Sequence, residues 1–184
     1  MPHSFSRVLL IMAALCGAVC AFAQSGWWLD VPYVGQQKDG CGAAVISMVM
    51  QYWQHQQGIS VTPAAEPAAI LEALYSSSAH GIYASAMQHY FEQNGFRALA
   101  FQGQWDDFAR ELAKGRPLIA ALKPDASGTL HYAVVAGVDT QSNLVLLNDP
   151  ARRKLLKEDR AAFEQEWKAT HNWTLLVVPQ PPQH

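Results

Sequence analysis

The strongest chemical signal in this sequence comes from a cysteine, Cys41, at the start of a predicted helix. Cys41 follows Asp39-Gly40, a dipeptide typical of turns, and opens a stretch with the apolar spacing of one helix face. A thiol attacks only as the thiolate, and a free cysteine, with a pKa of about 8.5, is mostly protonated at neutral pH. A helix N-terminus favours the anion, because its unpaired N–H groups and the positive end of the helix dipole point towards it. Cys41 is therefore the candidate nucleophile.

His131 is the candidate base that a thiol nucleophile needs. It is one of seven histidines, and it differs from the others because it opens the strongly apolar stretch HYAVVAGV, which we interpret as a strand. An ordinary surface or core histidine is the commoner interpretation of a single residue of this type. The residues that end the next predicted strand, described below, favour a chemical role.

Asp149 is the candidate residue that orients this histidine. The stretches 131–138 and 143–148 are predicted to form an antiparallel hairpin, in which the start of the first strand lies beside the end of the second. His131 and Asp149 (or Asn148) are therefore expected to be neighbours. An acceptor at this place would hold the imidazole in the tautomer that a base requires. The alternative is that Asp149-Pro150 only forms a turn after the strand.

Gln36 is a weaker candidate, for a different role. It lies five residues before Cys41. Its side-chain amide could donate a hydrogen bond to the oxyanion that forms at the scissile carbonyl, together with the N–H of Cys41. Glutamines in loops are usually only solvated. No motif for a metal or an organic cofactor accompanies these residues, so neither is expected.

The elements that must position these side chains follow from the periodicity of the apolar residues. Helices are predicted over 41–57, 66–76, 82–93, 105–114 and 160–168, and strands over 96–101, 117–122, 131–138, 143–148 and 173–178. Gly40 is expected to permit a tight turn before the nucleophile, and Gly42 a close approach of the substrate backbone. Helices come first and strands follow, which predicts an α+β fold with a helical layer packed on an antiparallel sheet.

The composition is that of one globular domain, and the N-terminus has the features of a signal peptide that would precede it. Of the 184 residues, 50% are hydrophobic and 15% charged, and the net charge of −2 excludes bulk electrostatic attraction to nucleic acid or an anionic membrane. Arg7, a short apolar run over 8–23 and its small-residue end, Ala21-Phe22-Ala23, predict a secretory signal peptide over 1–23. The folded domain would then be 24–184.

A lipoprotein anchored through Cys20 is the alternative for the N-terminus. Gly17 stands where a lipobox has Leu, and Val19 where it has Gly or Ala, so cleavage after Ala23 is favoured. Removal of residues 1–23 would also remove Cys16 and leave Cys41 as the only thiol, without a disulfide partner. A lone thiol in an oxidising compartment favours a chemical role over that of a small buried apolar residue.

Four stretches resemble the bacteriocin-processing, double-glycine cysteine peptidases, a papain-like family. They are VPYVGQ (31–36), KDGCGAA (38–44), HYAVV (131–135) and NDP (148–150). The similarity covers nearly all of the mature chain and includes GRPLI (115–119), the step into the first sheet strand. It implies a papain-like fold over residues 24–184, with Cys41 as nucleophile, His131 as base, Asp149 as orienting residue and Gln36 as oxyanion donor.

The predicted function is that of a periplasmic or secreted cysteine peptidase that acts through an acyl-enzyme, without metal or cofactor. Relatives linked to ABC exporters cut leader peptides on the cytoplasmic side, so the predicted signal peptide favours an exported peptide or a segment of an envelope protein as substrate. An acyl transferase with the same residues is one alternative, because it shares the first half-reaction. A non-catalytic peptide-binding module is another. Nucleic acid is not expected as a partner, whereas a membrane-associated partner and the oligomeric state stay open.

Overall fold

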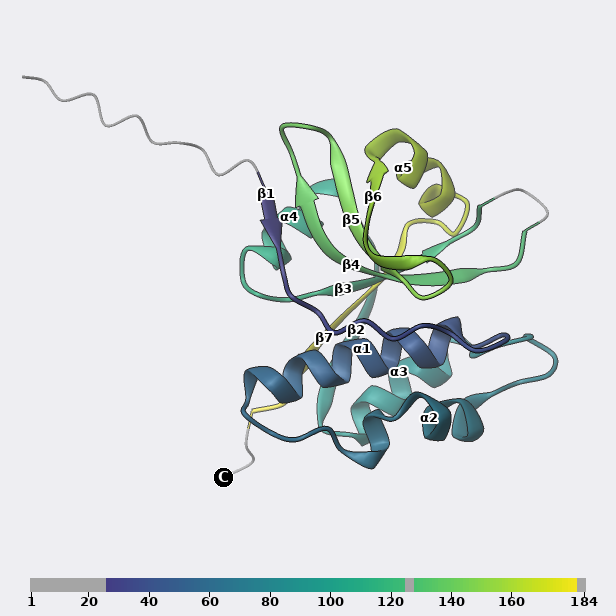
Figure 1. Cartoon of the computed structure of the whole chain (residues 1–184). Coiled ribbons are helices and arrows are strands. Elements are labelled where there is room, and N and C mark those ends of the chain that lie inside the picture. The colour runs from purple at the N-terminus through teal and green to yellow at the C-terminus, as the bar shows by residue number, and fades with distance from the viewer. Residues whose placement is uncertain (1–25, 125–127, 182–184) are drawn as a thin grey trace, which may run out of the picture.

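The protein folds into one antiparallel sheet with helices on both faces (Figure 1). The computed structural model describes residues 26–124 and 128–181, so the predicted signal peptide, residues 1–23, lies outside the described residues. Within the described part of the chain, no helix is long and apolar enough to cross a membrane.

The sheet has the strand order β2-β7-β3-β4-β5-β6, and β1 pairs with the far end of β4. β3 and β4 are buried along nearly their whole length, and so they form the middle of the domain. The strands are β1 (Gly26–Trp28), β2 (Phe96–Gln102), β3 (Leu118–Leu122), β4 (His131–Asp139), β5 (Leu144–Asp149), β6 (Arg153–Asp159) and β7 (Trp173–Pro179).

One face of the sheet is covered by the N-terminal helices. These are α1 (Cys41–Gln56), a 3₁₀ turn η1 (Pro63–Ala65), α2 (Pro67–Leu74) and α3 (Ala84–Gln93). α1 lies between the sheet and the other helices, and its residues from Gly42 to Met50 are all buried. The sequence predicted a helix over 41–57, and this prediction is confirmed. Its apolar side chains share one core with Tyr132, Val134 and Ala136 of β4.

The opposite face has a second, separate core under α4 (Trp105–Leu112) and α5 (Arg160–Lys168). Aromatic rings fill it: the ring of Phe108 lies 5.6 Å from that of Phe163 and 4.8 Å from that of Trp167, measured between centroids. The central strands β3 and β4 are therefore buried on both faces. Their ends are where polar side chains can meet a helix end without crossing a core.

The predicted fold class, a helical layer on an antiparallel sheet, is confirmed, and the helices lie within about two or three residues of their predicted bounds. Two strands were not predicted. β1 has only three residues, which is too short for a clear pattern. β6 reads RKLLKED, and the charged residues typical of an edge strand conceal the alternation of apolar and polar residues. The second helical layer, α4 and α5 on the opposite face, was not predicted either, because the sequence does not say which face of a sheet a helix covers.

The predicted hairpin of β4 and β5 sets the position of the candidate base. The two strands pair from Val134 and Asn148 outward to Asp139 and Leu144, with a bulge between Val135 and Gly137. A Cβ on Gly137 would lie 2.8 Å from the carbonyl oxygen of Trp27, so this glycine lets β1 approach β4 closely. The open end of the hairpin brings the first residue of β4 beside the last residue of β5.

We expect Phe108→Ala to lower the free energy of unfolding by about 3–5 kcal/mol, because it removes a buried ring from the centre of the second core. Urea denaturation followed by tryptophan fluorescence measures the change. The control is Leu99→Ala on β2, whose side chain is 61% exposed and whose loss should change stability by less than about 0.5 kcal/mol. Equal losses in the two variants would contradict the assignment of this core.

Candidate active site

The candidate nucleophile follows a tight turn that the chain makes just before α1. The N–H of Gly40 donates to the carbonyl of Gln37 over 3.0 Å, and Asp39 has a left-handed φ of 57°. A Cβ on Gly40 would lie only 3.0 Å from that same carbonyl oxygen. The turn predicted from Asp39-Gly40, and the need for glycine at position 40, are both confirmed. Cys41 is the first residue of α1 and is partly exposed, with a free thiol.

The backbone N–H groups at the N-terminus of α1 are not capped by a described side chain. Among the described residues, no side chain caps the helix at Gly40, and its first turn holds no acidic residue. Unpaired N–H groups at a helix start carry a partial positive charge that favours an anion. An anion at the Cys41 sulfur, or at a carbonyl oxygen beside it, would therefore be stabilised by the backbone.

Gly42 has a different role from the one that the sequence suggested. A Cβ at this position would lie 2.9 Å from Cβ of Ile82, in the loop before α3. Gly42 is buried, so it cannot admit a substrate backbone. The prediction of substrate access was wrong, because the group that approaches closely is a side chain of the protein itself.

His131 and Asp149 meet at the open end of the hairpin. Nε2 of His131 lies 2.8 Å from Oδ1 of Asp149, and their side chains are 17% and 7% exposed. Cys41 also interacts with the same imidazole, and this interaction raises the pKa of His131. Because Asp149 accepts from Nε2, Nδ1 is the nitrogen left for the sulfur. The predicted proximity of His131 to Asp149 is confirmed, and the structure brings both to Cys41.

The electrostatics of this group favour a charged imidazolium beside a charged carboxylate. Burial lowers the pKa of His131, but the hydrogen bonds to Asp149 and Cys41, and their charges, outweigh it and raise the pKa from 6.5 to about 9. Burial alone would raise the pKa of Asp149. The hydrogen bond and charge of His131, with a hydrogen bond from the N–H of Ala151, instead lower it. The two side chains hold each other in their charged forms.

Asn148, the alternative partner of His131, has a structural role instead. It is fully buried; its Nδ2 donates to the carbonyl of Val31 over 3.0 Å, and its Oδ1 accepts from the N–H of Leu155, also over 3.0 Å. Asn148 therefore ties the chain before α1 to β5 and β6. Sequence reasoning did not assign this role, although the position of Asn148, directly before Asp149 at the end of an apolar strand, was a signal for it.

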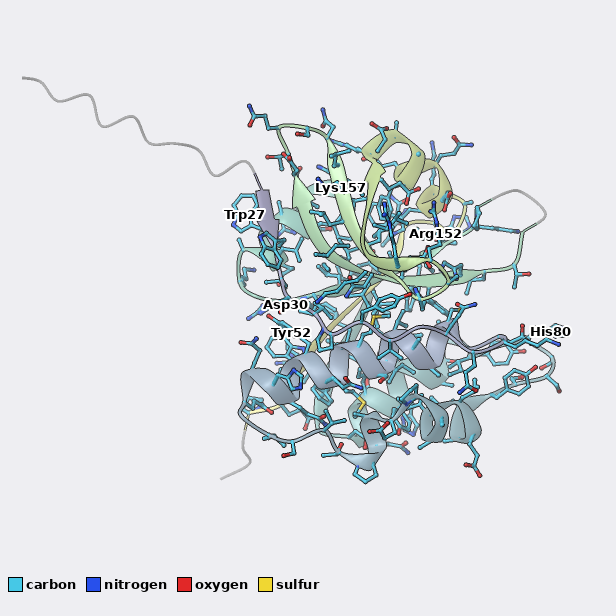
Figure 2. All side chains as sticks on the ribbon, in the orientation of Figure 1. Trp27, Asp30, Tyr52, His80, Arg152 and Lys157 are labelled. Atoms are coloured by element: carbon cyan, nitrogen blue, oxygen red, sulfur yellow. The ribbon has the colours of Figure 1, made fainter. Side chains whose placement is uncertain are left out.

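The lead-in segment, residues 29–40, joins β1 to α1 and is fastened along its length to the end of the hairpin. The side chain of Asp30, labelled in Figure 2, pairs with Lys154 of β6 over 2.6 Å. The hydroxyl of Tyr33 donates to the carbonyl of Asp149 over 3.3 Å. The N–H of Gln36 donates to the carbonyl of Pro150 over 2.9 Å. The residues around the candidate orienting carboxylate thus also position the chain that leads to the nucleophile.

Gln36 lies beside the first turn of α1, as the predicted role requires. Together with Gly40 and Ala43 it lines a cavity of about 30 Å³. Its Oε1 atom is buried without a hydrogen-bond partner among the described residues. A buried polar atom without a partner is costly and needs an explanation. The unpaired atom is an acceptor, whereas the predicted oxyanion role needs the Nε2 amino group as donor, so this orphan oxygen is not itself the group that the role requires.

Among the described residues, no other histidine forms a hydrogen bond or ion pair with this group. His80 sits at the outer tip of the loop before α3 (Figure 2). Within residues 26–124 and 128–181, no group of three or more His, Cys, Asp or Glu side chains could hold a metal ion. The side chains of the candidate site are a thiol at a helix start, an imidazole held by a carboxylate, and the amide of Gln36 beside the first turn of α1.

The sequence profile of the Peptidase_C39 like family matches residues 28–175 of the chain. The chain belongs to this family. The match spans the lead-in segment, α1 and the hairpin, and so it includes Cys41, His131, Asp149 and Gln36. A comparison with curated proteins gave no match.

Solved structures of C39 peptidases have the same fold. A protein described as a C39-like peptidase from Bacillus anthracis is 16% identical, with 85% of this chain and 99% of that one covered and a TM-score of 0.66. The peptidase domain of Streptococcus ComA, a bi-functional ABC transporter, is 21% identical over 80% and 98%, with a TM-score of 0.61. A double glycine motif protease of an AMS/PCAT transporter, solved with the leader peptide, is 19% identical over 84% and 95%, with a TM-score of 0.61.

Membership of the family makes the protein a cysteine-type peptidase, a hydrolase, and this confirms the prediction from sequence. The predicted papain-like, double-glycine peptidase fold is confirmed by the same profile and by the solved structures. The predicted roles of the four side chains stay predictions, and the predicted domain limits of 24 and 184 are not tested.

We expect the imidazole of His131 to titrate near pH 9 in the native protein, and at lower pH in Asp149→Asn, because the carboxylate charge is lost. Cys41→Ala should lower this pKa as well. NMR titration of the histidine ring resonances measures all three. Because the pKa is raised on folding, His131 should stabilise the fold fully below pH 6.5, and this contribution should disappear as the pH rises through about 9. A His131 that titrates near 6.5 in all three proteins would disprove the coupling.

Proposed function

We propose that Cys41, His131, Asp149 and Gln36 form the catalytic machinery of this peptidase. The observation that carries the proposal is the group in which Asp149 holds Nε2 of His131 at 2.8 Å while Cys41, at the start of α1, acts on the same ring. Each of these three residues comes from a different element, Cys41 from α1, His131 from β4 and Asp149 from β5. A nucleophile, a base and an orienting acceptor within hydrogen-bond reach are what acyl transfer to a thiol requires.

In the proposed first half-reaction, the Cys41 sulfur, with its proton held by His131, attacks the carbonyl carbon of a peptide bond. The carbonyl π electrons move to oxygen, and the oxyanion accepts hydrogen bonds from the N–H of Cys41 and the amide of Gln36. When the intermediate collapses, the C–N bond breaks and the His131 imidazolium gives its proton to the leaving amine. The products are an acyl-enzyme thioester and a new N-terminus.

In the second half-reaction, neutral His131 takes a proton from water as the water oxygen attacks the thioester. The C–S bond breaks, the acid product leaves, and the sulfur and imidazolium return to their first state. Asp149 keeps the ring oriented and stabilises its charge in both steps without being protonated itself. The raised pKa of His131 supports this scheme, because it keeps the proton on the ring until the leaving group needs it.

We further propose that the substrate is an exported peptide or a flexible segment of an envelope protein, met in the periplasm or outside the cell. The predicted signal peptide supports the location. A structural relative solved with a leader peptide supports an extended peptide as the ligand of this fold. The net charge of −2 offers no attraction to nucleic acid.

We expect Cys41→Ala to abolish peptide cleavage, and His131→Ala to lower kcat/KM by about 10²–10⁴-fold. Gln36→Ala should lower kcat by about 10²–10³-fold, because one oxyanion donor is lost. Cleavage of a peptide mixture followed by mass spectrometry, together with the rate of alkylation by iodoacetamide across pH, gives both readouts. In the wild type, the pH dependence of the alkylation rate should reflect the ion pair of Cys41 and His131. His131→Ala should change this pH dependence.

The matched control is His89→Ala, which removes an exposed histidine of α3 with a side chain 68% exposed, and it should leave both readouts unchanged. An iodoacetamide rate with the same pH dependence in wild type and His131→Ala would overturn the proposed roles. Cleavage that continues in Cys41→Ala would do the same. Incubation with added amines separates hydrolysis from acyl transfer, since a transferase would give amide products.

Export is tested separately. The native gene product, expressed in a bacterial host, should appear in the periplasmic or culture fraction with Gln24 as its first residue, because cleavage is expected after Ala23. Fractionation and N-terminal sequencing measure this. Lipid-modified Cys20 at the N-terminus would instead establish the lipoprotein alternative, and an uncleaved chain in the cytoplasm would refute export.

A further inference from the structure

A pocket of about 320 Å³ lies next to the proposed catalytic residues and has no role in the chemistry described above. Its lining comes from the ends of four elements and is mostly apolar. Among its lining residues are Ala84 of α3, Ala121 of β3, Leu130 and Tyr132 on either side of His131, Trp173 of β7, and the charged residue Lys123.

Tyr132 connects this pocket to the nucleophile. It follows His131 on β4 and packs with the α1 side of the sheet, where its ring meets that of Trp173 edge to face at 5.7 Å between centroids. Burial and the nearby charge of Cys41 both raise the pKa of Tyr132. The side chain that forms one wall of the pocket therefore lies within electrostatic reach of the sulfur.

The opposite wall is also connected to the nucleophile. Ile82 packs so closely on Gly42, the neighbour of Cys41, that a Cβ there would lie 2.9 Å from it. Only Tyr83 separates Ile82 from Ala84, which lines the pocket. Both walls of the pocket thus belong to segments that also hold or touch the neighbours of Cys41 and His131, so an extended peptide bound at Cys41 is expected to pass the pocket close to the scissile bond.

The chemistry of the lining indicates what enters. The hydroxyl of Thr170, one of its polar groups, is already engaged with the carbonyl oxygens of Ala121 and Trp167, at 2.7 Å each. Leu130 is 44% exposed and Trp173 only partly buried, so apolar surface is open to water here. Lys123 makes a basic side chain unfavourable as an occupant. The volume is at the lower end of those known for ligand sites, so it suits one side chain rather than a larger ligand.

We propose that this pocket is a specificity site that binds one large apolar side chain of the substrate, such as Leu, Met or Phe, within two residues of the scissile bond. The proposal rests on the proposed function, because it assumes that peptides are cleaved at Cys41. A substrate with glycine at the positions flanking the bond would leave the pocket unfilled. The substrate class of this enzyme is therefore a peptide with an apolar anchor rather than a double-glycine leader.

The test uses a synthetic peptide library of diverse sequence, digested by the mature protein and read by mass spectrometry. A large apolar residue should be enriched at one position within two residues of the cleaved bond. Replacing it by Gly in the best substrate should lower kcat/KM by about ten- to a hundredfold. Ala84→Phe, which fills the pocket, and Leu130→Asp, which charges its edge, should both remove the preference.

Leu99→Asp is the matched control, because it makes the same change at a leucine on β2 that is 61% exposed and does not line the pocket. It should keep the wild-type preference. Leu130→Asp alters an exposed side chain, so it keeps the test valid if Ala84→Phe fails to fold, which circular dichroism would reveal.

The outcomes separate this inference from the function on which it rests. Library peptides that all remain uncut would overturn the proposed function and the inference together. Efficient cleavage with glycine or alanine preferred at both neighbouring positions would overturn the inference alone. The same holds if an apolar preference survives in both pocket variants.

Discussion

The site depends on how the N-terminus of α1 is held against the open end of the β4–β5 hairpin. These parts belong to different layers, and the apolar packing between the layers is not directional, so it does not by itself fix which atoms meet. Hydrogen bonds do have direction. The buried side chain of Asn148 bonds to Val31 and Leu155, and the N–H of Gln36 bonds to Pro150. These contacts place the turn before Cys41 within reach of His131.

This arrangement buries charge, and burial of charge rarely stabilises a fold. His131 and Asp149 compensate each other by a bond of 2.8 Å, and their pKa values move apart accordingly. A shifted pKa alone does not mark a catalytic group, however. Glu111 of α4 also has a lowered pKa, since its hydrogen bonds to Lys114 and Arg116 outweigh its burial, yet no nucleophile is among its partners. The imidazole that meets a free thiol is what distinguishes the site.

Much of this site could be predicted from the sequence because the decisive relations are local. Helical periodicity placed Cys41 at a helix start, and hairpin geometry placed the end of one strand beside the start of the other. The sequence could not decide between Asn148 and Asp149, because neighbouring residues on a strand point to opposite faces and the bulge shifts the register. The structure assigns Asp149 to the imidazole and Asn148 to the lead-in segment.

Other features depend on contacts between distant parts of the chain, and no local pattern reports them. The partner of Gly42 is Ile82, forty residues later, and the aromatic core under α4 and α5 joins residues more than fifty apart. The charged residues of the edge strand β6 mask the alternation of apolar and polar residues that would predict a strand. Only the pairing of β6 with β5 identifies it as one. In each case the tertiary contact, rather than local propensity, determines the structure.

The two cores also explain how one scaffold can serve different substrates. Cys41, His131 and Asp149 lie at element ends whose positions are fixed by a sheet with central strands buried on both faces, so these ends tolerate little movement. Ala84, Leu130 and Trp173 are also at element ends, but their side chains are partly exposed and line an open pocket. A change of size at Ala84 or Leu130 would leave both cores intact, because neither residue belongs to them. Under the proposed roles, chemistry and specificity can therefore vary independently in this fold, since the first is set by the sheet and the second by side chains at its edge.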